Sequence, residues 1–285
     1  HVTGGPIYYL RARFQGGFGK FLAGFFSVAI IFALGFTGNM VQANSISVAF
    51  KTAFGAPQIA VGVVCALIAA FIFLGGVGRI ASVTEKVVPI MALFYMAGCV
   101  VILCFNHAAI IPAFKAIFVA AFDPQAILGG AAGITIQKAM RYGVARGLFS
   151  NEAGMGSTPH AHAVAKVEHP AIQGLVAMFG VFATVVVVTF TGIVILVTGV
   201  LDFQTTGIEL TQKAYTQGLG TFGMGFVAVC LFFFAYSTII GWNFFAEQNV
   251  RFLWGEYAVL PYRVIVCLFI GVGAVLKVEI GRAHV

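Results

Sequence analysis

Residues 21–50 read FLAGFFSVAIIFALGFTGNMVQANSISVAF, a run of 30 residues without a charged side chain. A second uncharged run of 31 residues, AIQGLVAMFGVFATVVVVTFTGIVILVTGVL, covers residues 171–201. An α-helix needs about 20 mainly apolar residues to cross a bilayer, and both runs exceed that length. These two stretches predict helices that span a membrane.

The composition of the whole chain also indicates a membrane protein. Hydrophobic residues make up 60% of the 285 residues, charged residues 9%, and the mean hydropathy is +1.01. Soluble domains carry roughly 25% charged residues, and a soluble domain of this length could not bury so much apolar surface. The net charge of +7 comes from Lys and Arg scattered along the chain, not from a basic stripe, which argues against nucleic acid as a partner. The five cysteines lie in apolar stretches without metal-ligand spacing, so they indicate neither a disulfide framework nor a metal site.

We therefore expect an all-α polytopic membrane protein. Charges and Pro/Gly clusters separate apolar spans at about residues 21–50, 57–78, 87–105, 131–165, 171–200, 219–245 and 264–276. The segment 110–122 is too short to cross and carries Lys115, so we expect an interfacial helix there. Eight basic residues fall in the loops on one side of these spans and three on the other, which places the N-terminus in the cytoplasm by the positive-inside rule.

The fourth span is interrupted at residues 146–159, which read RGLFSNEAGMGSTP. Glycines relax the backbone there, and Pro159 removes an amide donor. A break in a spanning helix survives only inside protein or beside a water-filled cavity, because unpaired backbone groups are costly in hydrocarbon. In secondary transporters, the two ends at such a break hold a carboxylate and a cation. We predict one discontinuous helix, with a plain loop between two helices as the alternative; the break residues are Asn151, Glu152, Gly154, Gly156 and Ser157.

Glu152 is a carboxylate near the middle of this span, and it needs a partner such as Arg141 or Arg146. It could be an ion or proton site, or it could brace the break through hydrogen bonds to free amides. Ser157 and His160 suggest another class of function, an intramembrane hydrolase, although no Gly-x-Ser-x-Gly turn or orienting acid supports it. The histidines after the break lack further zinc ligands at useful spacing.

Gln42 lies on a polar face of the first span, and its amide could bind an ammonium group or a carboxylate. Small and polar residues share that face and suit close helix packing: Gly35, Gly38, Asn39, Ser45 and Ala49. A repeat of threonine every seven residues on the fifth span has the same interpretation: Thr184, Thr191 and Thr198.

The sixth span carries Ser237 and Thr238, whose hydroxyls are the oxygen ligands that sodium takes. Trp242 lies four residues beyond Thr238 on the same helix face. It could wall a small pocket or belong to the aromatic belt at the membrane interface, where we expect Trp254.

Four motifs resemble the alanine/glycine:cation symporter family: residues 4–10 (GGPIYYL), 38–44 (GNMVQAN), 147–157 (GLFSNEAGMGS) and 234–242 (FAYSTIIGW). They occur in the family's order, and the likeness runs over nearly the whole chain. The resemblance implies a symporter of the bacterial inner membrane that takes up alanine or glycine by alternating access. It implies sodium, or in some members protons, as the coupling ion and no further cofactor. It also implies the five-plus-five inverted-repeat fold of the leucine-transporter type.

The resemblance also assigns site residues, motif by motif. The substrate residues are Gln42, Leu148, Phe149, Ser150, Thr238 and Trp242, and the residues near a sodium ion are Ser237 and Thr238. No metal other than sodium is expected. Within transport, the alternative is an inverted-repeat symporter for another small solute.

Inverted repeats need a broken helix in each half, and this chain carries one. We therefore expect residues 1–278 to form a single, partial transporter domain without the family's first broken helix and last spans. Residues 279–285, EIGRAHV, resemble a translated sequencing adapter, and we exclude them from the fold.

Overall fold

The computed structural model describes residues 4–122, 136–201, 205 and 207–276. The described residues form helices and no strand, and five helices are long and apolar enough to cross a membrane. The prediction of an all-α polytopic membrane protein is thereby confirmed. The inverted repeat stays a prediction, and the tail at 279–285 lies outside the described residues.

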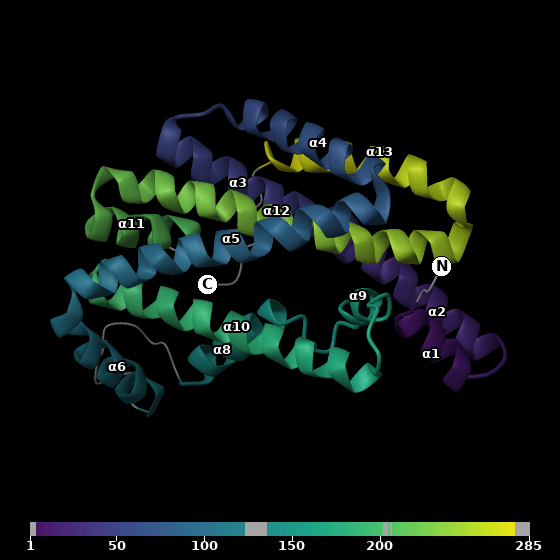
Figure 1. Ribbon diagram of the computed structural model, residues 1–285, viewed down its shortest axis with the longest axis horizontal. Coiled ribbons are helices and arrows are strands. Elements are labelled where there is room, and N and C mark those ends of the chain that lie inside the picture. Colours follow the sequence, from purple (N-terminus) through teal and green to yellow (C-terminus); the bar gives the residue numbers. More distant parts are fainter. Residues whose placement is uncertain (1–3, 123–135, 202–204, 206, 277–285) are drawn as a thin grey trace.

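The first uncharged run forms the middle of one continuous rod, Gly17–Phe54, built from α2 (Gly17–Ile30), η1 (Ile31–Gly38) and α3 (Asn39–Phe54) (Figure 1). The central piece η1 is a π-helix, whose hydrogen bonds close a wider turn than those of an α-helix. Gly55, with φ 68°, ends the rod in the left-handed conformation that favours glycine. The short helix α1 (Pro6–Arg13) precedes the rod and packs against α2.

Next come α4 (Gln58–Leu74), α5 (Gly76–Phe105) and α6 (His107–Phe122). The helix expected from residue 87 begins at Gly76, because Arg79, Glu85 and Lys86 interrupt the apolar run without interrupting the helix. Only Gly75 separates α4 from α5, and Gly76 takes a positive φ of 69° at this sharp turn. α6 covers the segment for which an interfacial helix is expected.

The interrupted span consists of α8 (Ile136–Ser150), irregular turns, and α9 (Pro159–His162), a single turn of helix. The segment after the break is therefore not a second long half-helix. Its expected beginning at 131–135 lies outside the described residues. The chain then enters α10 (Pro170–Val197), which carries the second uncharged run.

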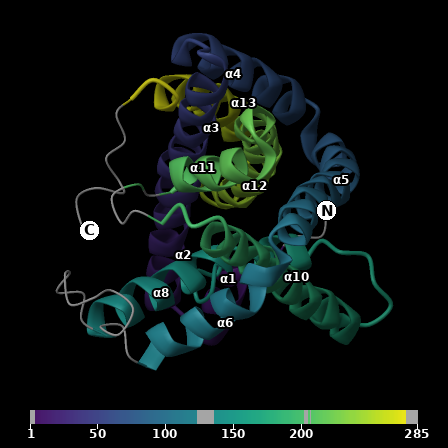
Figure 2. The same ribbon diagram turned by 90° about the vertical axis from the view of Figure 1, so that its left-hand side faces the viewer.

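The last part contains α11 (Ile208–Leu219), α12 (Thr221–Trp254), η2 (Glu256–Ala258) and α13 (Val259–Gly273). α11 was not expected from the sequence, because Glu209 and Lys213 keep it from being an apolar span. α12 packs against α2, η1, α3, α5, α11 and α13 and holds much of the buried core. Figure 2 shows α3, α4, α12 and α13 grouped on one side, with α6, α8 and α10 on the other.

The two ends of the bundle differ in charge. α1 and α9 lie at one end, which we call the α9 end, and α6 and α11 lie at the other (Figure 1). Eight basic residues belong to segments at the α9 end: Arg11, Arg13, Lys20, Arg79, Lys86, Lys166, Arg251 and Arg263. Three belong to helices that reach the opposite end: Lys51, Lys115 and Lys213. Leaving aside the basic residues of α8, the fold thus groups the basic residues as the sequence predicts. That the α9 end faces the cytoplasm, as the positive-inside rule implies, stays a prediction.

Candidate functional site

A cleft of about 540 Å³ lies between α3, α5, α8, α10 and α12. It brings together four residues assigned by the resemblance, although they come from three helices far apart in the sequence: Gln42, Ser150, Ser237 and Thr238. Apolar side chains such as Met91, Val187 and Phe234 form much of the remaining wall. A mostly apolar cleft with a few converging polar groups is the usual form of a small-molecule site.

Gln42 reaches this cleft from α3 and is half-buried. Within the described part of the chain, its amide has no hydrogen-bond partner. An amide carries both donors and an acceptor, so it can bind either end of an amino acid.

The hydroxyls of Ser237 and Thr238 donate to the same carbonyl, that of Phe234, at 2.9 and 3.0 Å. Because each hydroxyl proton is directed to the backbone, the oxygen lone pairs remain available to accept. Two neighbouring hydroxyl oxygens on the cleft wall are therefore suitable ligands for a hard cation.

Thr184 also lines the cleft, which differs from its interpretation as a packing residue. Its hydroxyl donates to Gly180 of its own helix at 3.0 Å. Thr191, one heptad later, does join helices, because it bonds with the hydroxyl of Tyr95 on α5 at 2.7 Å. The seven-residue spacing was the available signal, and it does not distinguish a cleft-facing threonine from a packed one.

The other three assigned substrate residues, Leu148, Phe149 and Trp242, do not line this cleft. Phe149 packs edge to face on Trp242, with ring centroids 6.1 Å apart. Trp242 is 5% exposed, which excludes the interface-belt interpretation, whereas Trp254 is 50% exposed and fits it. The substrate roles of these three residues stay predictions.

The break follows Ser150 directly, so it adjoins the cleft. Gly154 and Gly156 take positive φ angles of 78° and 73°, which explains their place in the motif. The amide of Asn151 donates to the carbonyl of Gly147 at 3.1 Å and thereby caps α8.

Glu152 accepts hydrogen bonds from the Trp242 indole and from the Ser157 hydroxyl. The expected arginine partners, Arg141 and Arg146, are exposed, and in the described part of the chain no ion pair joins either to Glu152. The brace is thus made by side-chain donors, not by an arginine or free amides.

The arrangement of Ser157 and His160 does not support hydrolysis. The Ser157 hydroxyl is buried and points to Glu152, so it is not activated by His160. The ring of His160 is occupied on both nitrogens, by the Ser157 carbonyl at 2.9 Å and by the Asn249 amide at 3.0 Å. A general base must reach the proton it removes, and this histidine does not.

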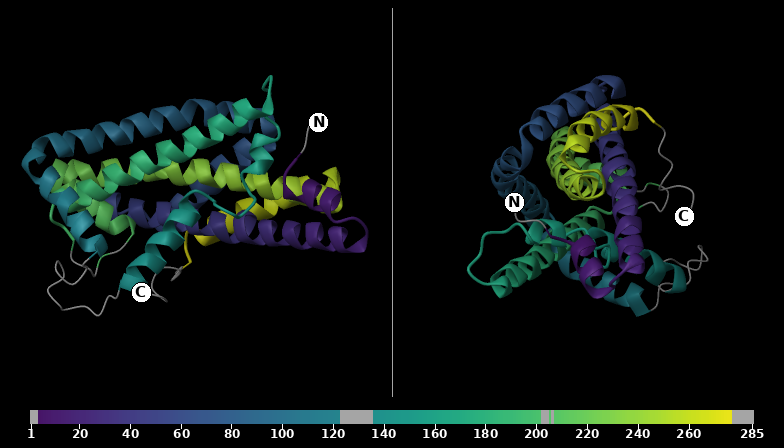
Figure 3. Two further views of the ribbon diagram at one scale, coloured as in Figure 1. Left: turned by 90° about the horizontal axis from the view of Figure 1, so that it is seen from below. Right: turned by 90° about the vertical axis from the view of Figure 1, so that its right-hand side faces the viewer.

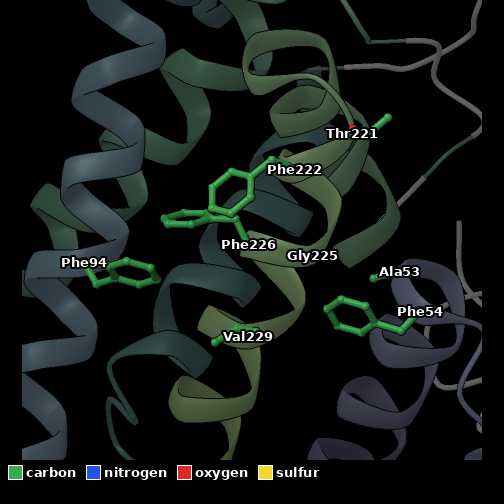
Figure 4. Close-up of a pocket in the computed structure, with 8 residues that line it drawn as sticks. All are labelled: Ala53, Phe54, Phe94, Thr221, Phe222, Gly225, Phe226 and Val229. Atoms are coloured by element: carbon green, nitrogen blue, oxygen red, sulfur yellow. The ribbon is translucent and has the colours of Figure 1, made fainter.

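A second hollow, of about 300 Å³, lies between α3, α5 and α12 near the opposite end of the bundle (Figure 4). Phenyl rings surround it, and the Thr221 hydroxyl is the one side-chain polar group among the labelled residues: Ala53, Phe54, Phe94, Thr221, Phe222, Gly225, Phe226 and Val229. A lining of this kind cannot compensate the charged ends of an amino acid. The cleft at Gln42 is therefore the candidate site.

Known proteins resemble this chain over most of its length. The chain is 40% identical over 269 residues to the sodium/alanine symporter AgcS of Methanococcus maripaludis, covering 92% of this chain and 58% of that protein. It is 38% identical over 241 residues to the sodium/proton-dependent alanine carrier protein of Bacillus sp. strain PS3, covering 79% and 53%. It is 35% identical over 281 residues to a Bacillus subtilis protein named "Probable sodium/glutamine symporter GlnT", covering 97% and 57%.

The chain thus spans little more than half the length of these relatives. The family in question consists of transporters and not of enzymes, in agreement with the site geometry. The model of the sodium:alanine symporter family matches residues 1–281, and the chain belongs to that family.

Proposed function

We propose that this chain is part of a secondary transporter of the bacterial inner membrane that couples uptake of alanine or glycine to the entry of sodium. The observation that carries the proposal is the cleft, where Gln42, Ser237 and Thr238 meet between membrane-spanning helices. A free amide and a pair of hydroxyl oxygens in one cleft offer contacts for a small polar solute and for a cation together. Coupling follows when ion and solute each favour the same occupied state of the transporter.

The small size of the solute is supported by the lining. Gln42 and the hydroxyls of Ser237 and Thr238 approach from α3 and α12. Apart from Ser150 and Thr184, the rest of the wall is apolar, with side chains such as Met91, Val187 and Phe234. A mostly apolar wall accepts a methyl group or a hydrogen without cost, whereas a long polar side chain would need several partners, of which this wall offers few. This favours alanine or glycine over glutamine, the solute in the name of the Bacillus subtilis relative.

The test is uptake by the full-length protein in proteoliposomes with an imposed sodium gradient. Alanine or glycine should accumulate with sodium outside and not with potassium in its place, and glutamine should accumulate less. Gln42→Ala should lower uptake about tenfold or more, as expected when a bound polar group loses a hydrogen-bond partner. Trp242→Ala should also lower uptake, as the family resemblance implies.

Gln58→Ala is the matched control, because Gln58 bonds to Ser47 at 3.3 Å and does not line the cleft. Uptake by this variant should stay close to that of the parent. Failure of the parent to accumulate either amino acid would refute the proposed solutes, and unchanged uptake by both Gln42→Ala and Trp242→Ala would refute the site.

A further inference from the structure

Glu152 has a backbone conformation that ordinarily belongs to glycine. It is the one non-glycine residue of the described chain with a positive φ, of 51°. Its amide donates to Phe149 at 3.1 Å, and the next amide, of Ala153, donates to Leu148 at 2.9 Å. This pair of bonds is the Schellman motif that ends α8, with Glu152 at the left-handed position that usually takes Gly. A side chain at such a position is unfavourable, so its presence calls for a functional explanation.

The carboxylate of Glu152 provides that explanation, because it joins the break to α12. One oxygen accepts from the indole of Trp242 on α12, and the other accepts from the hydroxyl of Ser157. Trp242 and Ser157 are both buried. Since indole has a single N–H donor, the hydrogen-bonding capacity of Trp242 is fully used by Glu152.

A second contact joins the same two elements further along. His160 is fully buried; it bonds to the carbonyl of Ser157 at 2.9 Å and to the amide of Asn249 at 3.0 Å. Asn249 follows Trp242 by seven residues, so the two side chains lie two turns apart on one face of α12. The break is therefore held to α12 at two points that share Ser157.

These two contacts lie between the cleft and the α9 end. Ser150 lines the cleft immediately before the break, and Thr238 lines it one turn before Trp242. From Trp242, α12 continues to Trp254 at the end of the bundle where the purple helix α1 lies (Figure 3, left). Phe252 of α12 packs there on Tyr8 of α1, with ring centroids 6.0 Å apart. The segment that these contacts hold thus lies next to the cleft, on its side toward the α9 end.

We propose that Glu152 and His160 are positioning residues that clamp the break onto Trp242 and Asn249 and thereby close the cleft toward the α9 end. The clamp is the closed state of one of the two gates that alternating access requires, and in this respect it rests on the proposed function. Opening toward the α9 end releases the Trp242 indole from Glu152.

The test measures access to the cleft and needs no substrate. Ala183 lines the cleft on α10, so a full-length protein with Ala183→Cys and its other cysteines replaced can be labelled by a membrane-impermeant maleimide. Labelling rates are compared in vesicles of the two orientations, which expose either the α9 end or the opposite end.

Two variants open the clamp in different ways. Glu152→Gly removes the carboxylate and suits the left-handed backbone, so it does not endanger folding. Trp242→Phe keeps the ring and removes the N–H. Each should speed labelling from the α9 end about tenfold, the factor equivalent to about 1.4 kcal/mol of lost hydrogen bonding. Both variants break the same contact, the hydrogen bond between Glu152 and Trp242. The double variant should therefore be labelled little faster than either single variant.

Three further variants make the test specific. Glu152→Gln keeps an acceptor for the indole and should restore slow labelling, whereas Asn249→Ala should raise the rate through the second contact. Trp254→Phe, which alters the exposed tryptophan of the same helix, should leave the rate unchanged. Rates that match this control in both Glu152→Gly and Trp242→Phe would overturn the clamp, as would equal increases from both ends.

The same measurements separate the clamp from the transported solute. The clamp would stand, and the proposed solutes would be refuted, by one combination of results. In it, Glu152→Gly and Trp242→Phe are labelled faster from the α9 end, while the parent takes up neither alanine nor glycine. Normal uptake with unchanged labelling would refute the clamp alone.

Discussion

The carboxylate of Glu247 accepts two hydrogen bonds of 2.8 Å from the guanidinium of Arg263, and this pair joins α12 to α13. The Glu247 side chain is 1% exposed and that of Arg263 is 14% exposed. Arg251 adds a third bond to the same carboxylate at 3.2 Å and also pairs with the exposed Glu256 at 2.7 Å. One buried carboxylate thus joins α12 to α13 at the α9 end, beside the apolar core that the two helices share.

Arg263→Ala should therefore destabilise the protein strongly. Removing one partner of a buried ion pair costs about 3–5 kcal/mol, because the remaining charge is left without compensation. Melting of the purified full-length protein in detergent measures the effect. Arg251→Ala is the control: Arg251 is 24% exposed, and Glu247 keeps both bonds from Arg263 without it, so the loss should be about 1 kcal/mol or less. Equal losses of stability in the two variants would contradict the assignment.

Gly38→Ala should also destabilise, because the rod Gly17–Phe54 touches α12 closely there. A Cβ at Gly38 would lie 2.6 Å from the ring of Trp242. Overpacking of this kind costs about 1–3 kcal/mol. Gly24→Ala, in the same rod, meets no atom within 4 Å and should be neutral or stabilise by up to about 1 kcal/mol. The same melting assay checks both variants, and a stable Gly38→Ala protein would contradict the close contact.

The two threonines of α10 should respond oppositely to replacement by valine. Thr184→Val alters the cleft, so uptake should fall with little change in melting temperature. Thr191→Val leaves the Tyr95 hydroxyl without its partner and should cost about 1–3 kcal/mol of stability. Uptake and melting are measured on both proteins. If Thr184→Val lost stability and kept normal uptake, Thr184 would be a packing residue and not part of the site.

Thr238→Val should raise the sodium concentration needed for half-maximal uptake about tenfold, since it removes one of two adjacent oxygen ligands. Thr238→Ser retains the hydroxyl and should stay near the parent value. Thr198→Val is the matched control: Thr198 also donates to its own helix, at 2.8 Å from the carbonyl of Val194, but does not line the cleft. A sodium dependence that is the same in all three variants would remove Thr238 from the ion site.

Features that depend on local sequence were predicted well. The uncharged runs predict the spanning helices, and the Gly- and Pro-rich motif after Ser150 predicts where α8 ends. The sequence predicts that α5 begins near residue 87, because the charges of Glu85 and Lys86 lower the local hydropathy. The helix begins at Gly76, since a helix accommodates charged residues at its polar end. α11 was missed for the same reason, as its charged residues hide a helix that buries Tyr215.

Features that depend on contacts between distant helices were not predicted. Nothing near Glu247 in the sequence indicates that Arg263 is its main partner, although Arg251 at i+4 suggests an ion pair. The sequence points to nearby arginines as partners of Glu152, whereas its partners are Ser157 and Trp242, the latter 90 residues away. Such pairs arise when helices pack, and residue spacing within one span carries no record of them.

The π-helix η1 sets the rotational phase between the two halves of the first long helix. A π turn contains about one residue more than an α turn, so η1 acts as an insertion of one residue into an otherwise α-helical rod. Each residue of an α-helix advances the side chain by roughly 100°. If the same residues wound as a plain α-helix, the extra residue would turn Gln42 away from the cleft or turn Ala23 away from its buried position. The wider turns of η1 therefore keep the buried face of α2 and the cleft-lining face of α3 in their present relation.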